Sequence, residues 1–439
     1  MSRFIARAAF PASLLVSALG LGACTSTPIA QPASPQVPAA YRHARPTAGP
    51  VAAPIPQDAW WQVFRDPTLD ALEARASSAN TTIQAAAARL AKARALVRRT
   101  DAARSPQVAL RAGAGRQGGP VLNAAGGDGT LVVGAADLSY EADLFGRLQL
   151  ATDAADLDAQ SQEALLRGAR LLVQADVAQT YLALRAVDAE RALVRTTAAA
   201  YRDTVNITER RYRAGSVAEL DWVRARTELA SIESEALALE RRRTELEHAL
   251  ALLAGEAASG FELPQGEWTT ILPDIPAGVP GAVLTRRPDI SAAQRSMLAA
   301  QSRLGLARTA WFPSLTLTAS GGYASASLGD LLQASMRTWG VGALLGLTLL
   351  DGGRREAEVQ GANADLEGAL ASYREQILVA FRDVEDQLSS LQLLADQAQV
   401  QSAAVDLGSR ASLLADSRYR SGLASQLDVL DARRVELRE

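Results

Sequence analysis

One stretch of the chain returns almost unchanged 207 residues further along. RYRAGSVAELDWVRAR at 211–226 recurs as RYRSGLASQLDVLDAR at 418–433, and the same offset carries Pro106 onto Pro313. A chain with this kind of self-similarity folds as copies of one supersecondary unit that pack against each other. The sequence therefore predicts a tandem duplication, with the same elements in the same order in both copies.

The shared register sets the expected boundaries of the copies. It holds from about residue 77 to 232 and from 284 to 439. We expect repeat 1 at 59–255, a linker at 256–283 and repeat 2 at 284–439. The helical pattern of repeat 1 runs on to about residue 255, whereas its counterpart stops at residue 439, so the end of repeat 2 is expected to be incomplete.

Each copy contains a predicted β-hairpin, at 106–143 and at 313–350, preceded by a helical stretch at 68–103 or 288–310. In the last strand every second residue is apolar: Trp339, Val341, Ala343, Leu345, Leu347 and Leu349. A period of two predicts a strand with one apolar face. Strands of about 9 to 13 residues are long enough to cross a bilayer at a tilt.

The strands predict a membrane barrel shared by several chains. Aromatic residues lie near the strand ends, among them Tyr140, Trp311 and Tyr323, as is typical of membrane interfaces. Unpaired strand edges cannot lie in lipid, and the smallest closed barrels have about eight strands. The four strands of one chain are too few to close a barrel, so several chains must associate to form it. The alternative, the edge of a soluble β-sandwich, fits the alternation but not the long flanking helices.

Long helical runs follow each hairpin, from about residue 147 and about residue 354. From Leu150 to Leu182, small and apolar residues recur at alternating spacings of four and three, which is typical of a helix packed along a seam. Glycine tolerates the positive φ that ends a helix. Each copy is therefore predicted to form a helical hairpin, with its tip near 215 or near 422, and about 60 residues make a rod on the order of 90 Å.

The N-terminus has the pattern of an export signal. Arg3 and Arg7 precede a short apolar run, which predicts a signal peptide at 1–23. The peptide ends in Leu-Gly-Ala before Cys24 and resembles the lipobox of bacterial lipoproteins. This resemblance implies a covalent lipid on Cys24 and, with Thr25 next, sorting to the outer membrane. An ordinary secretory signal is the alternative. Residues 24–58 are proline-rich and predict an extended, lipidated tether.

Composition excludes several classes of function. The chain has 45 Lys and Arg against 48 Asp and Glu, a net charge of -3, so nucleic acid is not an expected partner. Cys24 is the only cysteine, and His43 and His248 are the only histidines, which leaves little for thiolate or imidazole chemistry. Residues 113–118 match GxGxxG, but Gly-Pro follows instead of a helix. We expect no enzyme activity, no metal and no cofactor other than the covalent lipid.

Several motifs together resemble one known family. In chain order they are WWQVFRDPTLDAL at 60–72, EADLFGR at 141–147, RPDI at 287–290, AWFP at 310–313, LDGGR at 350–354 and LDVLDA at 427–432. With the doubled RYRxG tip, they resemble the outer membrane factors of tripartite efflux systems, the TolC-like and NodT-like outer membrane lipoproteins, over about residues 58–439.

This resemblance implies a mixed, mainly α fold and a transport function. The expected homotrimer closes one transmembrane β-barrel of twelve strands, four from each chain, and continues into the periplasm as a long α-helical barrel. It implies a passive exit duct in the cell outer membrane, without catalytic residues, for small molecules such as drugs or toxic compounds. It also implies an inner membrane pump, expected to be of the RND type, and a periplasmic adaptor (membrane fusion protein) as partners.

The resemblance also assigns roles at the hairpin tips. Adaptor contact is expected at Arg211, Tyr212, Arg213 and Gly215 in repeat 1, and at Arg418, Tyr419, Arg420 and Gly422 in repeat 2. The two glycines are also expected to permit the turns themselves.

Two acidic residues are expected to narrow the periplasmic entrance. Asp428 and Asp431 match the family's motif there and share one helix face. Their counterparts in repeat 1 are Asp221 and Arg224, so the two hairpins are not equivalent. A solvated helix face is the alternative interpretation. Ala424 stands where some relatives have a latching arginine, so that latch is not expected.

Two other functions stay open at this point. A duct for type I secretion of proteins or peptides would use the same fold. A periplasmic adaptor or a structural coiled-coil lipoprotein would share the acyl anchor and the long hairpins, but would not need two aromatic-flanked membrane hairpins.

Overall fold

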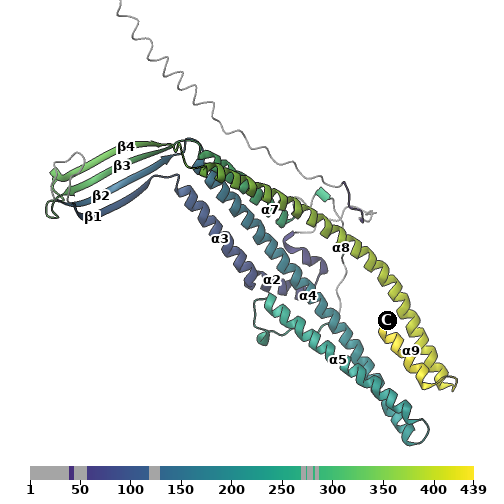
Figure 1. Ribbon diagram of the computed structural model, residues 1–439. Coiled ribbons are helices and arrows are strands. Elements are labelled where there is room, and N and C mark those ends of the chain that lie inside the picture. The colour runs from purple at the N-terminus through teal and green to yellow at the C-terminus, as the bar shows by residue number, and fades with distance from the viewer. Residues whose placement is uncertain (1–38, 44–56, 118–128, 268–272, 274–279, 282–285) are drawn as a thin grey trace, which may run out of the picture.

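The computed structural model describes residues 39–43, 57–117, 129–267, 273, 280–281 and 286–439. The predicted signal peptide at 1–23, the proposed lipid site Cys24 and most of the tether lie outside the described residues. Figure 1 shows a sheet at one end of the molecule and a long bundle of helices that leads away from it to two hairpin tips.

The described elements follow the order expected from the duplication. They are η1 Gln57–Phe64, α2 Pro67–Ala79, α3 Thr81–Ala102, β1 Gln107–Gln117, β2 Gly129–Ala142, α4 Arg147–Arg213, α5 Glu219–Leu253, η2 Ala258–Gly260, α7 Pro288–Thr309, β3 Ser314–Ser325, η3 Ala334–Met336, β4 Arg337–Gly346, α8 Arg354–Arg420 and α9 Gln426–Arg438. The prediction of a mainly helical fold with four strands per chain is confirmed.

The first helical stretch is divided in two, which the sequence pattern did not predict. The Asp66 side chain caps α2 by accepting from the Thr68 and Leu69 amides, with Pro67 as the first helical residue. Asn80 ends α2 and begins α3, because its side-chain oxygen accepts from the Thr82 amide at 2.9 Å. Asparagine competes with the helix for backbone hydrogen bonds and therefore favours such a junction.

The main core lies where α2, α3 and α5 cover α4. Its largest fully buried side chains include Leu69, Tyr181, Leu184 and Leu250. The Tyr181 hydroxyl donates to Asp66 Oδ2 at 2.6 Å and so ties α4 to the start of α2. A smaller core in repeat 2 contains Ile290, Ile377 and Ala380, where α7 meets α8. Among the described residues, no helix combines the length and the apolarity that a membrane-spanning helix requires.

The four strands form one antiparallel sheet in the order β1-β2-β3-β4. β2 and β3 come from different repeats and pair from Val132 with Ser325 to Ala142 with Leu315. β4 ends at Gly346, so Leu347 and Leu349 lie beyond the strand on which the period of two placed them. The ladder between β3 and β4 stops at Ser314 because the preceding residue, Pro313, has no amide proton to donate.

Aromatic and charged side chains fasten the sheet to the helices. Phe145, before α4, stacks on Phe312, before β3, with ring centroids 4.9 Å apart. The Arg355 guanidinium lies 4.5 Å from the Trp311 ring centroid and also binds Asp351 at 2.6 Å. The junction of each copy is therefore fixed by side chains close to the point where the chain changes from strand to helix.

Candidate functional site

The two hairpin tips turn in the same way. In repeat 1, the Ser216 amide donates to the Arg211 carbonyl at 2.8 Å and Gly215 has a φ of 70°. In repeat 2, the Leu423 amide donates to the Arg418 carbonyl at 2.8 Å and Gly422 has a φ of 72°. This is the Schellman ending of a helix, in which glycine takes the left-handed conformation without steric cost.

Side chains at the tip of repeat 1 mostly bind within their own hairpin. The Tyr212 ring stacks on Trp222 of α5, with centroids 5.6 Å apart and planes 8° from parallel. The Arg226 guanidinium lies over the Trp222 ring, 5.2 Å from its centroid. Arg213 is exposed and pairs with Glu209 one turn earlier, at 2.6 Å. Trp222 was not among the predicted residues. The signal for this stack is that a tryptophan near the start of α5 faces a tyrosine near the end of α4 across a short turn.

The tip of repeat 2 is joined to that of repeat 1. Arg211 donates to the Tyr419 hydroxyl at 2.7 Å, and its guanidinium lies 5.9 Å from the Tyr419 ring centroid. The equivalent tyrosines therefore differ, since Tyr212 stacks inside its hairpin and Tyr419 binds the other one. Arg420 pairs with Asp416 at 2.6 Å, and Arg418 is exposed.

Asp428 has a structural partner that sequence spacing did not reveal. Its carboxylate accepts from the Ser425 amide at 2.8 Å and from the Ser425 hydroxyl at 2.9 Å, while the Asp428 amide donates back to Ser425 Oγ. These bonds form a capping box at the start of α9. The Ser425 amide is also the main reason that the pKa of Asp428 lies below its usual range. Asp428 is exposed, and these hydrogen bonds favour its anionic form at neutral pH.

Asp431 and its repeat-1 counterparts have different surroundings. Asp431 is exposed and lies 3.6 Å from Arg434, one turn further along α9. Asp221 occupies the third position of α5, as Asp428 does in α9, but the capping residue there is Ala218 and has no side chain that can cap. Arg224 is exposed. The hairpins thus share a backbone but not a charge pattern.

Further ion pairs join α9 to repeat 1. Arg434 binds Glu228 of α5, and Arg433 lies 3.4 Å from the Thr204 hydroxyl of α4. Within repeat 2, Arg433 also lies 3.6 Å from Asp416 of α8. The 207-residue offset relates equivalent positions and carries no information about contacts between the copies. These residues were therefore not predicted.

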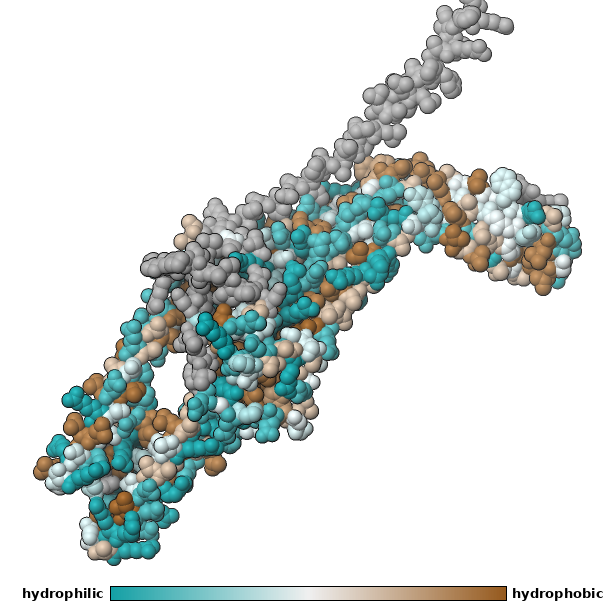
Figure 2. All heavy atoms as spheres, turned by 180° about the vertical axis from the view of Figure 1, so that it is seen from behind, coloured by the Kyte–Doolittle hydropathy of each residue, from teal (hydrophilic) through white to brown (hydrophobic). Residues whose placement is uncertain are grey.

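The sheet has one apolar and one polar face. The cross-strand pairs place apolar side chains on one face, namely Val108, Leu110, Leu138, Leu315, Leu317, Trp339, Val341 and Leu345. Several are almost fully exposed, including Leu110 at 88% and Trp339 at 81%. Figure 2 shows the corresponding brown patches on the sheet end of the molecule.

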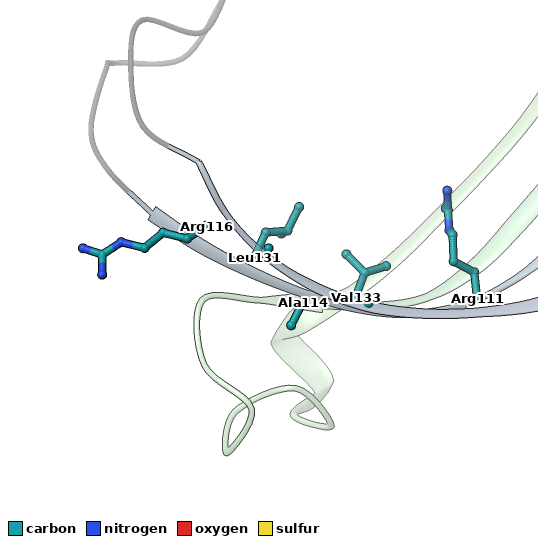
Figure 3. Close-up of a pocket in the computed structure, with 7 residues that line it drawn as sticks. Arg111, Ala114, Arg116, Leu131 and Val133 are labelled. Carbon is teal, nitrogen blue, oxygen red and sulfur yellow. The ribbon is translucent and has the colours of Figure 1, made fainter.

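The opposite face is lined mainly by small and polar residues, and its apolar members are Leu131, Val133 and Leu344. It holds Thr316, Thr318 and Ser320 of β3, and an ion pair of 3.4 Å between Arg111 and Asp137. A hollow lies beside β1 at the outer end of the sheet. In the close-up of this hollow (Figure 3), Arg111, Leu131 and Val133 point to one side of the sheet and Ala114 to the other.

Among the described residues, no group of three or more His, Cys, Asp or Glu side chains is arranged to hold a metal ion. The one cysteine, Cys24, lies outside the described residues.

Known proteins share both the sequence and the fold. The model of the outer membrane efflux protein family matches residues 72–256 and 279–439. The chain is 32% identical over 432 residues to outer membrane protein OprJ of Pseudomonas aeruginosa, covering 97% of this chain and 90% of OprJ. It is 31% identical over 435 residues to the toluene efflux pump outer membrane protein TtgC of Pseudomonas putida, covering 96% and 89%.

Solved channel structures superpose along almost the whole chain. The outer-membrane channel OprN matches with a TM-score of 0.86 at 27% identity, covering 94% of both chains. The open state of the Neisseria gonorrhoeae MtrE outer membrane channel matches with a TM-score of 0.83 at 25% identity, covering 94% of this chain and 93% of MtrE. With these matches in sequence and in fold, the chain belongs to the outer membrane efflux protein family and is an outer membrane component of an efflux system.

Proposed function

We propose that three copies of this chain close one barrel of twelve strands and form a passive exit duct. The observation that carries the proposal is the four-stranded sheet, which has an exposed apolar face and, among the described residues, no strand paired with the outer edges of β1 and β4. Unpaired edges cannot lie in lipid. Pairing β4 of one copy with β1 of the next satisfies both edges and turns the apolar face toward lipid and the polar face toward the lumen.

The helices extend this duct away from the membrane. α4 and α8 each contain 67 residues, about 100 Å at 1.5 Å per residue. Side by side in a trimer, they would form a helical barrel long enough to reach far into the periplasm. The duct needs no catalytic residue, because a pump in the inner membrane, which we propose to be of the RND type, supplies the energy, and an adaptor joins pump and duct at the hairpin tips.

We propose small toxic molecules as the cargo. Related proteins are named for toluene efflux and for antibiotic efflux. We also propose that Cys24 carries a covalent lipid that anchors the N-terminus in the outer membrane.

The adaptor is proposed to contact the exposed part of each tip. The Arg213, Arg418 and Arg420 side chains are exposed, and among the described residues no side chain lies within 4 Å of where a Cβ would stand at Gly215 or Gly422. Arg211, Tyr212 and Tyr419 are already engaged with other side chains of the tips. Their contact with an adaptor would require the link between the two hairpins to open.

Electron microscopy and mass determination test the duct directly. Mature protein extracted from outer membranes in detergent is expected to have the mass of three chains and to appear as a hollow tube longer than about 100 Å. A monomer, or a solid rod, would contradict the proposal and favour a structural coiled-coil lipoprotein.

Asp428 and Asp431 are proposed to form two rings of three carboxylates at the closed entrance. Replacing both with alanine is expected to raise single-channel conductance about twofold or more and to reduce cation preference, because carboxylate rings attract and bind cations at a constriction. Conductance and reversal potential in planar bilayers measure both effects.

The control must separate charge from capping. Ser425→Ala removes the hydroxyl that caps α9 and leaves both carboxylates in place. It is expected to keep the wild-type cation preference. If the double variant also keeps wild-type conductance and selectivity, the carboxylates do not gate the channel.

A further inference from the structure

The connection between β3 and β4, residues 326–336, folds back over the apolar face of the sheet. Leu331 Cδ2 lies 4.0 Å from the place where a Cβ would stand at Gly134 of β2. The strand register places Gly134 on the same face as Leu110. Val132, the next residue of β2 on that face, is only 8% exposed, whereas Leu110 is 88% exposed. The connection therefore covers the part of the apolar face that lies furthest from the helices.

The close-up of the sheet shows the same arrangement. In Figure 3 the β3–β4 connection, with its short helical turn, lies on the side to which Ala114 points and away from Arg111, Leu131 and Val133. Ala114 belongs to the apolar face and the other three residues belong to the opposite face. In the proposed barrel, this connection therefore lies against the outer wall and not in the lumen.

The connection is held in shape by its own hydrogen bonds. The Ser327 hydroxyl donates to Asp330 Oδ2 at 2.6 Å, and the Asp330 amide donates back to Ser327 Oγ at 3.3 Å. The Gln333 side-chain amide donates to Asp330 Oδ1 at 2.6 Å. Asp330 is the only charged residue of 326–336, and both of its carboxylate oxygens are bound within the connection.

Two leucines of this ordered connection are largely uncovered. Leu328 is 76% exposed and Leu332 is 79% exposed. Leu331 reaches β2, two strands away from β4, so the connection leans away from the edge at which β4 would meet the next copy. A copy paired at that edge therefore does not cover the two leucines. Lipid is the apolar environment that the proposed barrel offers on this side.

Two arginines lie at the same end and on the same face of the sheet. Arg116 is close to the end of β1, Arg337 begins β4, and the strand register places both on the apolar face. Both are exposed, and neither forms an ion pair among the described residues. Arg111, on the opposite face, pairs with Asp137. When β4 of one copy pairs with β1 of the next, Arg337 and Arg116 come to one seam.

We propose that residues 326–336, Arg116 and Arg337 form a docking surface for phosphorylated lipid of the outer leaflet. Leu328 and Leu332 enter the hydrocarbon, and the two arginines bind the phosphate groups. Arginine suits this place because its guanidinium binds phosphate through two hydrogen bonds while its alkyl stem lies along apolar surface. The proposal rests on the proposed barrel, which sets the end of the sheet away from the helices in the outer leaflet.

Spin labels test whether the leucines lie in lipid. Leu328→Cys and Leu332→Cys are made singly with Cys24→Ser and a signal peptide that is removed without lipidation, and the labelled trimers are reconstituted in phosphatidylcholine bilayers. Collisions with oxygen, which concentrates in hydrocarbon, are expected to exceed collisions with a water-soluble nickel chelate. Val341→Cys, on the apolar face of β4, is the lipid reference and Thr318→Cys, on the opposite face, is the water reference.

Lipid A, a glycolipid whose sugars carry phosphate groups, tests the arginines. The double variant Arg116→Gln, Arg337→Gln is expected to lower the affinity of the full-length trimer for lipid A about tenfold or more, because each arginine near a charged lipid surface contributes to binding. Native mass spectrometry of trimers taken from phosphatidylcholine vesicles that contain lipid A measures this affinity. Arg111→Gln removes an arginine of the same strand from the opposite face, and is expected to keep the wild-type affinity.

The outcomes separate this surface from the channel itself. If Val341 lies in lipid while both leucines contact water, the barrel stands and the docking surface is wrong. Leucine labels that meet neither reagent would show that protein covers them, which also overturns the surface. If the double arginine variant binds lipid A as tightly as the wild type, the arginines do not bind its phosphates. If Val341 contacts water as Thr318 does, the proposed barrel is wrong.

Discussion

Replacing Asp188 with alanine is expected to lower the free energy of unfolding of the helical region by about 3 to 5 kcal/mol. Asp188 lies on α4 and is buried with three arginines. Its carboxylate accepts from Arg243 at 2.8 Å, Arg185 at 3.2 Å and Arg191 at 3.3 Å. Removal of the group that binds all three leaves the buried Arg185 guanidinium without its acidic partner, whereas Arg191 keeps Glu240 and Arg243 keeps Glu247.

The same cluster holds the chain after α5 in place. Arg243 donates to the Leu263 carbonyl at 2.6 Å, and Arg185 donates to the Pro264 carbonyl at 2.9 Å. We therefore expect the Asp188 variant also to release residues 261–266, which hydrogen exchange would show as faster exchange of the Leu263 amide. That amide donates to Glu247 Oε1 at 2.6 Å.

Denaturant unfolding followed by circular dichroism measures the loss of stability. Glu209→Ala is the control, because it removes an exposed pair with Arg213 between residues four apart on a helix. Such pairs contribute only about 0.3 to 0.5 kcal/mol. If the two variants lose the same stability, the buried cluster contributes no more than a surface pair.

Glu73→Gln is expected to remove a loss of stability that the wild-type protein suffers as the pH rises. Glu73 lies on the buried face of α2, is fully buried, and neither carboxylate oxygen has a hydrogen-bond partner among the described residues. Burial, with a smaller contribution from Asp70, raises the pKa of Glu73 to about 8. The carboxyl is therefore protonated in the folded protein at neutral pH.

The sign of the effect follows from linkage. The unfolded chain releases this proton near its ordinary pKa of 4.5, whereas the folded chain keeps it until about pH 8. The contribution of the Glu73 carboxyl to stability is therefore greatest below pH 4.5 and falls as the pH rises to about 8, by on the order of 4 kcal/mol. A glutamine has the same shape and cannot ionise. The variant is therefore expected to keep the stability that the wild-type protein loses when Glu73 ionises.

Thermal unfolding between pH 5 and pH 9 checks the prediction. The difference in midpoint between Glu73→Gln and wild type is expected to grow steadily across this range and to level off above pH 8. Glu235→Gln, at an exposed position of α5, is expected to leave the wild-type pH dependence unchanged. If Glu73→Gln shows the same dependence of the unfolding midpoint on pH as the wild type, the pKa of this carboxyl is not raised in the folded protein.

The repeat and the period of two predicted most of the fold. A constant offset can be read directly from the sequence, and the alternation around Trp339 gave the apolar face of β4 because side chains on a strand must alternate. Gly215 and Gly422 were predictable as turns, since few other residues adopt positive φ without cost. The boundary at Asn80 was not, although Ser77, Ser78, Thr81 and Thr82 around it are weaker helix formers than the alanines further along both helices.

The sequence pattern did not predict the contacts between the two copies. Nothing in the pattern pairs Arg211 with Tyr419, because the offset aligns Arg211 with Arg418. The Asp188 cluster was missed for a different reason. Arginine is so abundant here, with Lys92 as the only lysine, that individual arginines carried little information. The contact of His43 with Glu385 joins two segments more than 340 residues apart, so no local pattern around either residue indicates it.

The pairing of β2 with β3 has a consequence for how this protein assembles. Each hairpin closes through a short connection, but β2 ends at Ala142 and β3 begins at Ser314, with α4, α5 and α7 between them. Contacts between residues so distant along a chain form slowly, because the loop must lose its entropy before the pairing can offset that loss. α7 leads directly into β3 and packs along α4, which follows β2. We therefore expect these two helices to dock before the strands pair, so that the water-exposed part of the molecule acts as the folding template for the part that enters the membrane.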